Sequence, residues 1–67
     1  MSFESLTVKL NDGRTLYFPA GPDVGDNTDR VELLRECIDN GTDFISVDNN
    51  GEKHQFNGYD VVNYHLA

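Results

Sequence analysis

The chain has 67 residues, of which twelve are Asp or Glu and five are Lys or Arg, so its net charge at neutral pH is −7. A chain of this length forms a single domain, residues 1–67, with no room for a second hydrophobic core. The charge argues against direct binding to nucleic acid or to anionic membranes, because both depend on Lys and Arg side chains. An acidic protein is attracted instead to proteins that carry basic grooves.

The lone cysteine, Cys37, excludes an intramolecular disulfide, and together with His54 and His65 it matches no zinc-ligand spacing. A single free thiol is typical of a reducing compartment. The first residues include neither a basic region nor an apolar run, and no stretch approaches the length of a membrane span. We therefore expect a soluble, cytoplasmic protein without a metal or a cofactor.

Two β-prone runs near the start predict a hairpin. Residues 6–10 alternate apolar and polar side chains, and residues 15–18 form a second short run after an Asp-Gly pair. A three-residue loop with Gly13 in the left-handed region sets Val8 opposite Leu16. This register places the apolar residues of both strands on one face, whereas a two-residue loop does not, so we predict the three-residue loop.

A loop and a helix follow. Residues 19–27 contain two prolines, two glycines and two aspartates, which indicates a connecting loop. Thr28 or Asn27 is predicted to cap a helix that runs to about Asn40, with Gly41 as a left-handed stop. Its apolar stripe, expected to pack on a sheet, consists of Val31, Leu34 and Ile38, flanked by Leu33 and Cys37.

A second hairpin is predicted from the runs 44–47 and 53–56, which flank an Asn-Gly pair. A two-residue type I′ turn pairs Asp48 with Lys53, whereas a three-residue loop opposes Asp48 to Glu52, two like charges. We therefore predict the two-residue turn.

The last run, residues 59–66, alternates at Val62, Tyr64 and Leu66, and its β-branched pair and short length favour a strand over a helix. The expected element order is β-β-α-β-β with a fifth strand. This is an α+β fold in which a single helix packs on a small antiparallel sheet.

Four carboxylates line one face of the predicted helix. Asp29, Glu32, Glu36 and Asp39 are spaced three, four and three residues apart, so they lie within an arc of about 80° opposite the apolar stripe. Successive carboxylates are roughly 5 Å apart along the axis, which is in the range of phosphate spacing along a nucleic-acid strand, about 3.4 Å. Three further aspartates extend this acidic row: Asp23, Asp26 and Asp43.

The ordinary interpretation of such a row is the solvated face of an amphipathic helix. The first two helix carboxylates fit it, since the helix dipole favours negative charge near the N-terminus. Glu36 and Asp39 lie near the C-terminus, where the dipole disfavours them. Few cations neutralise the row, although Arg35 can reach Glu32 or Asp39. The placement reduces stability without an evident structural benefit, which favours a binding role.

Other groups of polar residues in the sequence are better explained by ordinary structural roles than by chemistry. Residues 48–52 are rich in oxygen ligands, but their glycine stands in the fourth position rather than the sixth, so we interpret them as a hairpin turn and not as a calcium loop. His54 and His65 are candidates to pair with Asp60 or Cys37 for acid–base work, but no spacing fixes such a geometry. We expect no catalytic activity.

Tyrosine is enriched at binding hot spots, so Tyr17, Tyr59 and Tyr64 are candidate interface anchors. Tyr17 alternates with Leu16 and Phe18 and is therefore predicted to lie on the outer surface of the sheet.

Our first hypothesis is a protein-binding inhibitor that presents the acidic row to a basic, nucleic-acid-binding groove of a partner protein and acts as a decoy for the phosphate backbone. In size, charge, single-helix α+β pattern, lone cysteine and carboxylate row, the chain resembles the small acidic anti-CRISPR proteins of phages, several of which mimic DNA and block a Cascade-type or Cas8-type subunit of a CRISPR effector complex. The resemblance implies a host–virus role without cofactor or catalysis. The expected partner-binding residues are Asp23, Asp26, Asp29, Glu32, Glu36, Asp39, Asp43 and Tyr17.

The alternative hypothesis is a small accessory or assembly protein that docks a partner, or a second copy of itself, through its sheet face or a strand edge. In that case the acidity serves only solubility. Both hypotheses are compatible with a monomer or a weak homodimer.

Overall fold

The computed structural model describes residues 3–48 and 50–67. The predicted α+β class and element order are confirmed in these ranges. The strands divide between two antiparallel sheets, ordered β2-β1-β5 and β3-β4, instead of forming one. The elements are β1 (Leu6–Leu10), β2 (Thr15–Phe18), α1 (Thr28–Asn40), β3 (Asp43–Val47), β4 (Lys53–Asn57), the 3-10 turn η1 (Gly58–Asp60) and β5 (Val61–Leu66).

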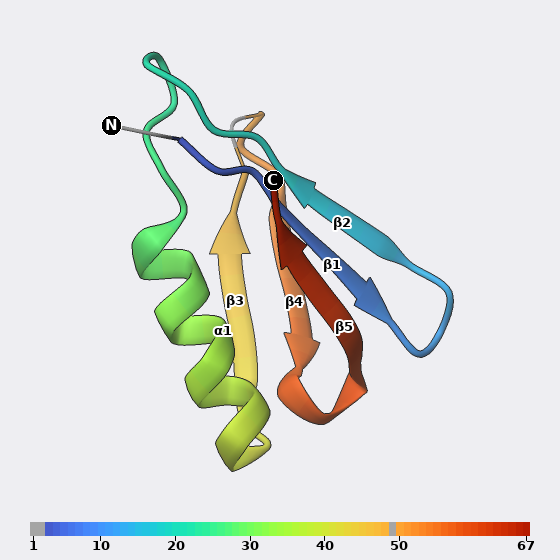
Figure 1. Cartoon of the computed structure of the whole chain (residues 1–67). Coiled ribbons are helices and arrows are strands. Elements are labelled where there is room, and N and C mark those ends of the chain that lie inside the picture. Colours follow the sequence, from blue (N-terminus) through green and yellow to red (C-terminus); the bar gives the residue numbers. More distant parts are fainter. Residues whose placement is uncertain (1–2, 49) are drawn as a thin grey trace.

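The helix and the far strand of the larger sheet form opposite sides of the molecule. Figure 1 shows α1 beside β3 on one side and β2 on the other, with β4, β5 and β1 between them. The rings of Phe44 and Phe56 stack with their centroids 4.8 Å apart, and the ring of Phe18 meets that of Phe44 edge-on. These rings belong to one core of buried side chains, which are Leu6, Val8, Leu10, Phe18, Val31, Leu34, Cys37, Phe44 and Phe56.

The first hairpin has the predicted register. Val8 pairs with Leu16 and Leu6 with Phe18, and Gly13 adopts a φ of 94°, in the left-handed region that favours glycine. The three-residue loop is thus confirmed, because it turns the apolar side chains of both strands to the core.

The predicted two-residue turn of the second hairpin is wrong. Phe44 pairs with Phe56 and Val47 with Lys53, so Asp48 faces Glu52 across the turn, and its N–H donates to the carbonyl of Glu52 at 2.9 Å. Pairing the two phenylalanines puts both rings in the core, which outweighs the like charges at the tip. Residue 49 of the predicted turn lies outside the described residues.

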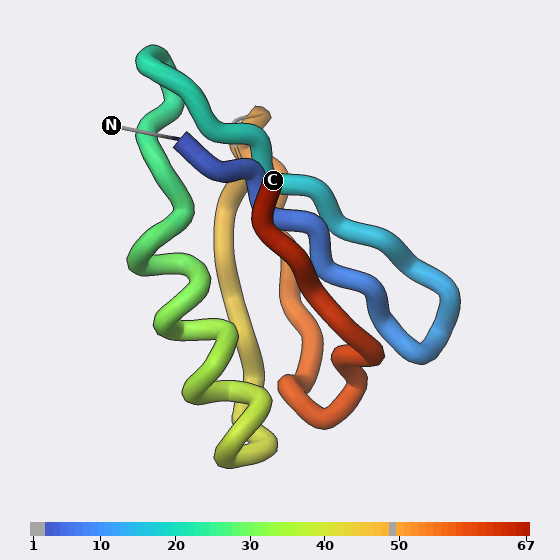
Figure 2. Tube along the Cα trace, viewed as in Figure 1, coloured from blue at the N-terminus to red at the C-terminus, as the bar shows by residue number. Residues whose placement is uncertain are grey.

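The predicted fifth strand is confirmed over Val61–Leu66, whereas residues 58–60 form a 3-10 turn. β5 pairs with β1, which places Tyr64 opposite Val8. The start of β1 and the end of β5 lie side by side (Figure 2). There the N–H of Ser5 donates to the carbonyl of Ala67 at 2.8 Å, and the N–H of Ala67 donates to the carbonyl of Ser5 at 3.0 Å.

The helix begins and ends close to the predicted residues. Gly41 adopts a φ of 68° and its N–H donates to the carbonyl of Cys37 at 2.8 Å, which confirms the left-handed stop. Asn27 occupies the N-cap position, but its side chain makes no capping hydrogen bond to the helix. In the described ranges, no helix is long and apolar enough to span a membrane.

Candidate protein-binding surface

The acidic row is exposed along its whole length. The helix positions its four central carboxylates on the side of α1 that faces away from Val31 and Leu34, two residues buried in the core. The loop before α1 and the start of β3 supply the others. All seven members are exposed: Asp23, Asp26, Asp29, Glu32, Glu36, Asp39 and Asp43.

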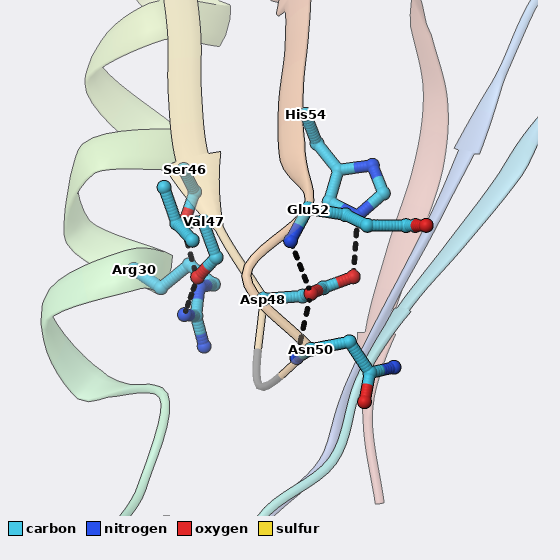
Figure 3. A network of polar contacts seen from close by, with 7 residues as sticks. All are labelled: Arg30, Ser46, Val47, Asp48, Asn50, Glu52 and His54. Atoms are coloured by element: carbon cyan, nitrogen blue, oxygen red, sulfur yellow. Dashed lines mark hydrogen bonds and ion pairs between the residues drawn. The ribbon is translucent and has the colours of Figure 1, made fainter.

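The first helix arginine is turned away from the row. Arg30 donates from Nε to the hydroxyl of Ser46 at 2.9 Å and from Nη2 to the carbonyl of Val47 at 3.2 Å, both in β3 (Figure 3). Its guanidinium also lies 4.3 Å from the ring centroid of Phe18 and donates to the side-chain oxygen of Asn27. Partial burial lowers the pKa of Arg30 below its usual value.

The second helix arginine is directed to the opposite flank. Arg35 donates from Nε to the hydroxyl of Tyr64 in β5 at 3.1 Å. This hydrogen bond, and more weakly the charges of Asp39 and Glu32, raises the pKa of Arg35. The expected contact of Arg35 with Glu32 or Asp39 is therefore electrostatic only, without an ion pair.

The acidic row consequently has no ion pair among the described residues. In the part of the chain that the structure describes, the two ion pairs join Asp12 to Arg14 and Asp48 to His54, and neither involves the row. Two members of the row accept hydrogen bonds: Asp26 from the N–H of Thr28, and Asp43 from the side chains of Gln55 and Asn57. The five others have no hydrogen-bond partner among the described residues.

A buried amide supports the N-terminal end of the row. Asn27 is 3% exposed, and its Nδ2 donates to the carbonyls of Glu4 and Phe18 at 2.8 and 3.2 Å, while its oxygen accepts from Arg30. One side chain thus joins the N-terminal segment, the end of β2 and the start of α1. Asn27 is one of the two residues predicted to cap the helix, and no local pattern reveals that its partners are distant.

Open hollows flank the first turns of the helix on both sides. One of about 360 Å³ lies between Glu32 of the row and Leu66 at the end of β5. The other, of about 350 Å³, lies between Asp29 of the row and Ser46 of β3, with Val24 and Leu33 at its border. Both are open to solvent and have carboxylates at their margins, so each can receive a side chain from a bound protein.

The second hairpin tip is a structural turn, as expected. Asp48 Oδ1 accepts the N–H of Asn50 at 2.8 Å and that of Glu52 at 2.9 Å, and Oδ2 lies 2.9 Å from Nε2 of His54 (Figure 3). The hydrogen bond to His54, then those from the turn, lower the pKa of Asp48. Asp48, Glu52 and His54 are the one group of three potential metal ligands within the described residues. The carboxylate of Asp48, however, already accepts the hydrogen bonds that hold the turn.

The other candidates for acid–base chemistry are dispersed. His65 is exposed on β5, where it pairs with Thr7 of β1. Cys37 is buried in the core and its thiol donates to the carbonyl of Asp43 at 3.4 Å. Neither residue joins a cluster of potential ligands with His54 in the described ranges.

The three tyrosines have different settings. Tyr17 is 60% exposed on the outer face of β2, as predicted, but β2 lies on the side of the molecule opposite α1 (Figure 1). Tyr64 is half-buried and is tied to Arg35. Tyr59 is 71% exposed and lies in η1, beside Gly41 at the C-terminal end of α1. The structure thus brings Tyr59, and not Tyr17, to the acidic row.

No family model matches the chain, and no curated protein or solved structure is significantly similar to it.

Proposed function

We propose that this chain is a protein-binding inhibitor that presents its acidic row to the basic, nucleic-acid-binding surface of a partner. It acts as a decoy for a phosphate backbone, without catalysis, in the cytoplasm of the cell that contains the partner. By its resemblance to phage anti-CRISPR proteins, the partner we propose is a CRISPR effector complex of the Cascade type.

The observation that carries the proposal is the orientation of the two helix arginines. Arg30 and Arg35 are the cations nearest to the row along the chain, yet their guanidinium groups are engaged with β3 and β5. A helix face that served solubility alone would gain stability from ion pairs between neighbouring residues. The row instead leaves its charge available to an external cationic surface, which would accelerate encounter and favour a basic groove.

A DNA-displacement assay tests the proposal. Purified Cascade-type complexes loaded with labelled double-stranded DNA are titrated with the protein and with the double variant Glu36→Lys/Asp39→Lys. The wild type should displace DNA without binding it, and the variant should displace it at least about tenfold less well, since a reversed charge both removes an attraction and adds a repulsion. Displacement should weaken as the salt concentration rises.

A matched variant controls for net charge. Asp12→Lys/Glu52→Lys makes the same change in total charge at two exposed hairpin tips outside the row, and we expect it to displace DNA nearly as well as the wild type. Equal displacement by the wild type and by Glu36→Lys/Asp39→Lys at low salt would show the proposal to be wrong.

A second candidate function is docking through the larger sheet. The outward residues of β2-β1-β5 include no carboxylate, in a chain with twelve, and Tyr17 stands at their margin. They pair across the strands as Thr7 with Tyr17 and His65, and Lys9 with Thr15 and Asn63. If Tyr17→Ala abolishes partner binding while the row reversals have no effect, this face is the docking surface.

A further inference from the structure

The corner between β4 and β5 fixes one exposed ring against the end of the helix. An added Cβ at Gly41 would lie 2.6 Å from Cζ and 2.9 Å from Cδ2 of Tyr59, so the ring occupies the space that a side chain would need. The φ of 68° at Gly41 independently favours glycine. The ring of Tyr59 is thus seated on the residue that terminates α1.

One side chain connects this ring to the last member of the acidic row. Asn57 donates from Nδ2 to the carbonyl of Gly41 at 2.7 Å and to Oδ1 of Asp43 at 3.3 Å, and its own oxygen accepts the N–H of Tyr59 at 2.9 Å. The backbone of Tyr59 and the carboxylate of Asp43 are therefore held in place by the same amide group.

Despite this support, the ring is uncovered. Tyr59, at 71%, has the highest exposed fraction of the large apolar and aromatic side chains among the described residues. The cation–π contact found in these residues belongs to Arg30 and Phe18 and not to Tyr59. An exposed aromatic ring with this support, near a carboxylate that forms no ion pair among the described residues, has the features of a binding hot spot.

We propose that Tyr59 receives an arginine side chain of the partner, with the guanidinium on the ring and Asp43 as its counter-charge. This inference rests on the proposed function, since it names the contact that anchors the C-terminal end of the acidic row. Arginine fits better than lysine, because its planar guanidinium stacks on an aromatic face and donates two parallel hydrogen bonds to a carboxylate. Nucleic-acid-binding grooves supply such side chains.

The test uses a defined probe, an acetylated and amidated hexa-arginine peptide, with hexa-lysine for comparison. Binding is measured by calorimetry at low salt for the wild type, Tyr59→Ala, Tyr59→Phe and Tyr17→Ala. Tyr59→Ala should bind hexa-arginine about two- to fivefold more weakly, the effect of one exposed cation–π contact, and should lose less affinity for hexa-lysine. Tyr59→Phe, which keeps the ring, and Tyr17→Ala, which removes a comparably exposed tyrosine on the far side, should bind as the wild type does.

Nuclear magnetic resonance locates the contact in the unmodified protein. On addition of hexa-arginine, the ring signals of Tyr59 should shift more than those of Tyr17. Asp43→Asn retains the ring and an acceptor for Asn57, and it should lower the preference for arginine over lysine. This variant tests the inference even where Tyr59→Ala disturbs the corner.

Two results would overturn the inference. One is wild-type affinity for hexa-arginine in both Tyr59→Ala and Asp43→Asn, and the other is an equal loss in Tyr59→Ala and Tyr17→Ala. Neither touches the proposed function, which fails only if reversal of Glu36 and Asp39 leaves DNA displacement unchanged.

Discussion

Gly58 allows the backbone of η1 to touch the backbone of α1. It is buried, and a Cβ added there would fall on the carbonyl group of Cys37 and close to the nitrogen of Ile38. Since these are main-chain atoms of a helix, they cannot move aside as a flexible side chain does. The contact fixes the distance between the helix and the corner that carries Tyr59.

Gly58→Ala should therefore lower the free energy of unfolding by about 2–3 kcal/mol, the cost of overpacking against an unyielding neighbour. Urea denaturation followed by circular dichroism measures the change. Gly21→Ala is the matched control, because no atom lies within 4 Å of the added Cβ and the φ of Gly21 is not positive. Equal effects of the two substitutions would contradict the contact.

Asn27 is the second residue whose substitution the structure predicts to be severe. Asn27→Ala leaves the carbonyls of Glu4 and Phe18 and one guanidinium N–H of Arg30 without their partner. Because these groups lie in or near the core, we expect a loss of about 2–3 kcal/mol in the free energy of unfolding. Asn40→Ala, at an exposed helix position, should change it by less than about 0.5 kcal/mol.

Glycines 13 and 41 were predictable from sequence and Gly58 was not. The first two adopt positive φ angles at a hairpin loop and at a helix end. The residues that flank such positions in the sequence indicate where a positive φ is needed. Gly58 is needed for an approach between segments about twenty residues apart in the chain, and Asn27 likewise binds distant carbonyls. Sequence patterns report local conformation and contain little information on such contacts.

At the scale of elements, α1 covers the unpaired edge of β3. Arg30 and Cys37 donate to the carbonyls of Val47 and Asp43, which lie at opposite ends of the strand. An exposed strand edge invites pairing with other chains, and covering it with a helix prevents this. The same contacts hold Arg30 away from the acidic row, so edge protection and the free charge of the row have a common cause.

The second hairpin should respond to acid through Asp48. The pKa of Asp48 is lowered in the folded protein, so its contribution to stability is fully present above the unfolded-state pKa of about 3.9 and is lost as the pH falls through the lower folded-state pKa. The difference in unfolding free energy between the wild type and Asp48→Asn should accordingly shrink as the pH decreases from 5 towards 2.5.

Urea denaturation over that pH range measures this difference. Asp23→Asn, which removes a carboxylate with no hydrogen-bond partner among the described residues, is the control and should show no comparable trend. A difference between the wild type and Asp48→Asn that is independent of pH would contradict the role of the turn.

The two hairpins show where sequence reasoning on elements succeeds and where it fails. In the first, the alternation of both strands determined the register, and the prediction is confirmed. In the second, we chose the register from the like charges at the tip without considering the match of Phe44 with Phe56, and the observed register is the one we had rejected. The turn amides and His54 stabilise Asp48, so its repulsion by Glu52 is small compared with burial of two aromatic rings.

At the scale of the whole molecule, folding and partner binding should respond to salt in opposite directions. Three neighbouring carboxylate pairs along α1 repel one another by about 0.2–0.5 kcal/mol each, and sodium chloride screens that repulsion. We expect the free energy of unfolding to rise by up to about 1 kcal/mol between low and high salt, while the complex weakens.

Thermal and urea unfolding at increasing sodium chloride concentrations measure the effect on folding. Glu36→Gln/Asp39→Asn, which removes two charges with little change of shape, should be more stable than the wild type at low salt and less sensitive to salt. A wild-type stability that falls with added salt would show that the row is neutralised within the fold.

The acidic row itself was predicted from helical spacing alone, because four residues on one helix share a face whatever the tertiary fold. The scarcity of cations near it was also evident from the sequence, whereas the partners of Arg30 and Arg35 were not predictable, since they belong to strands distant in the sequence. For the same reason Tyr17 was grouped with the row and Tyr59 was not. Which tyrosine lies beside the helix depends on the arrangement of the sheets.

The central position of β1 has a consequence for the order of folding. β1 pairs on one side with β2, across a short loop, and on the other side with β5, where Leu6 meets Leu66 sixty residues later. The first pairing closes a small loop and can form early, whereas the second must await β5 and closes a much longer loop. Until β5 pairs with β1, the apolar residues Leu6, Val8 and Leu10 lie in an incomplete sheet. We therefore expect folding to be slow for a chain of this size, with the pairing of β5 as the rate-limiting step.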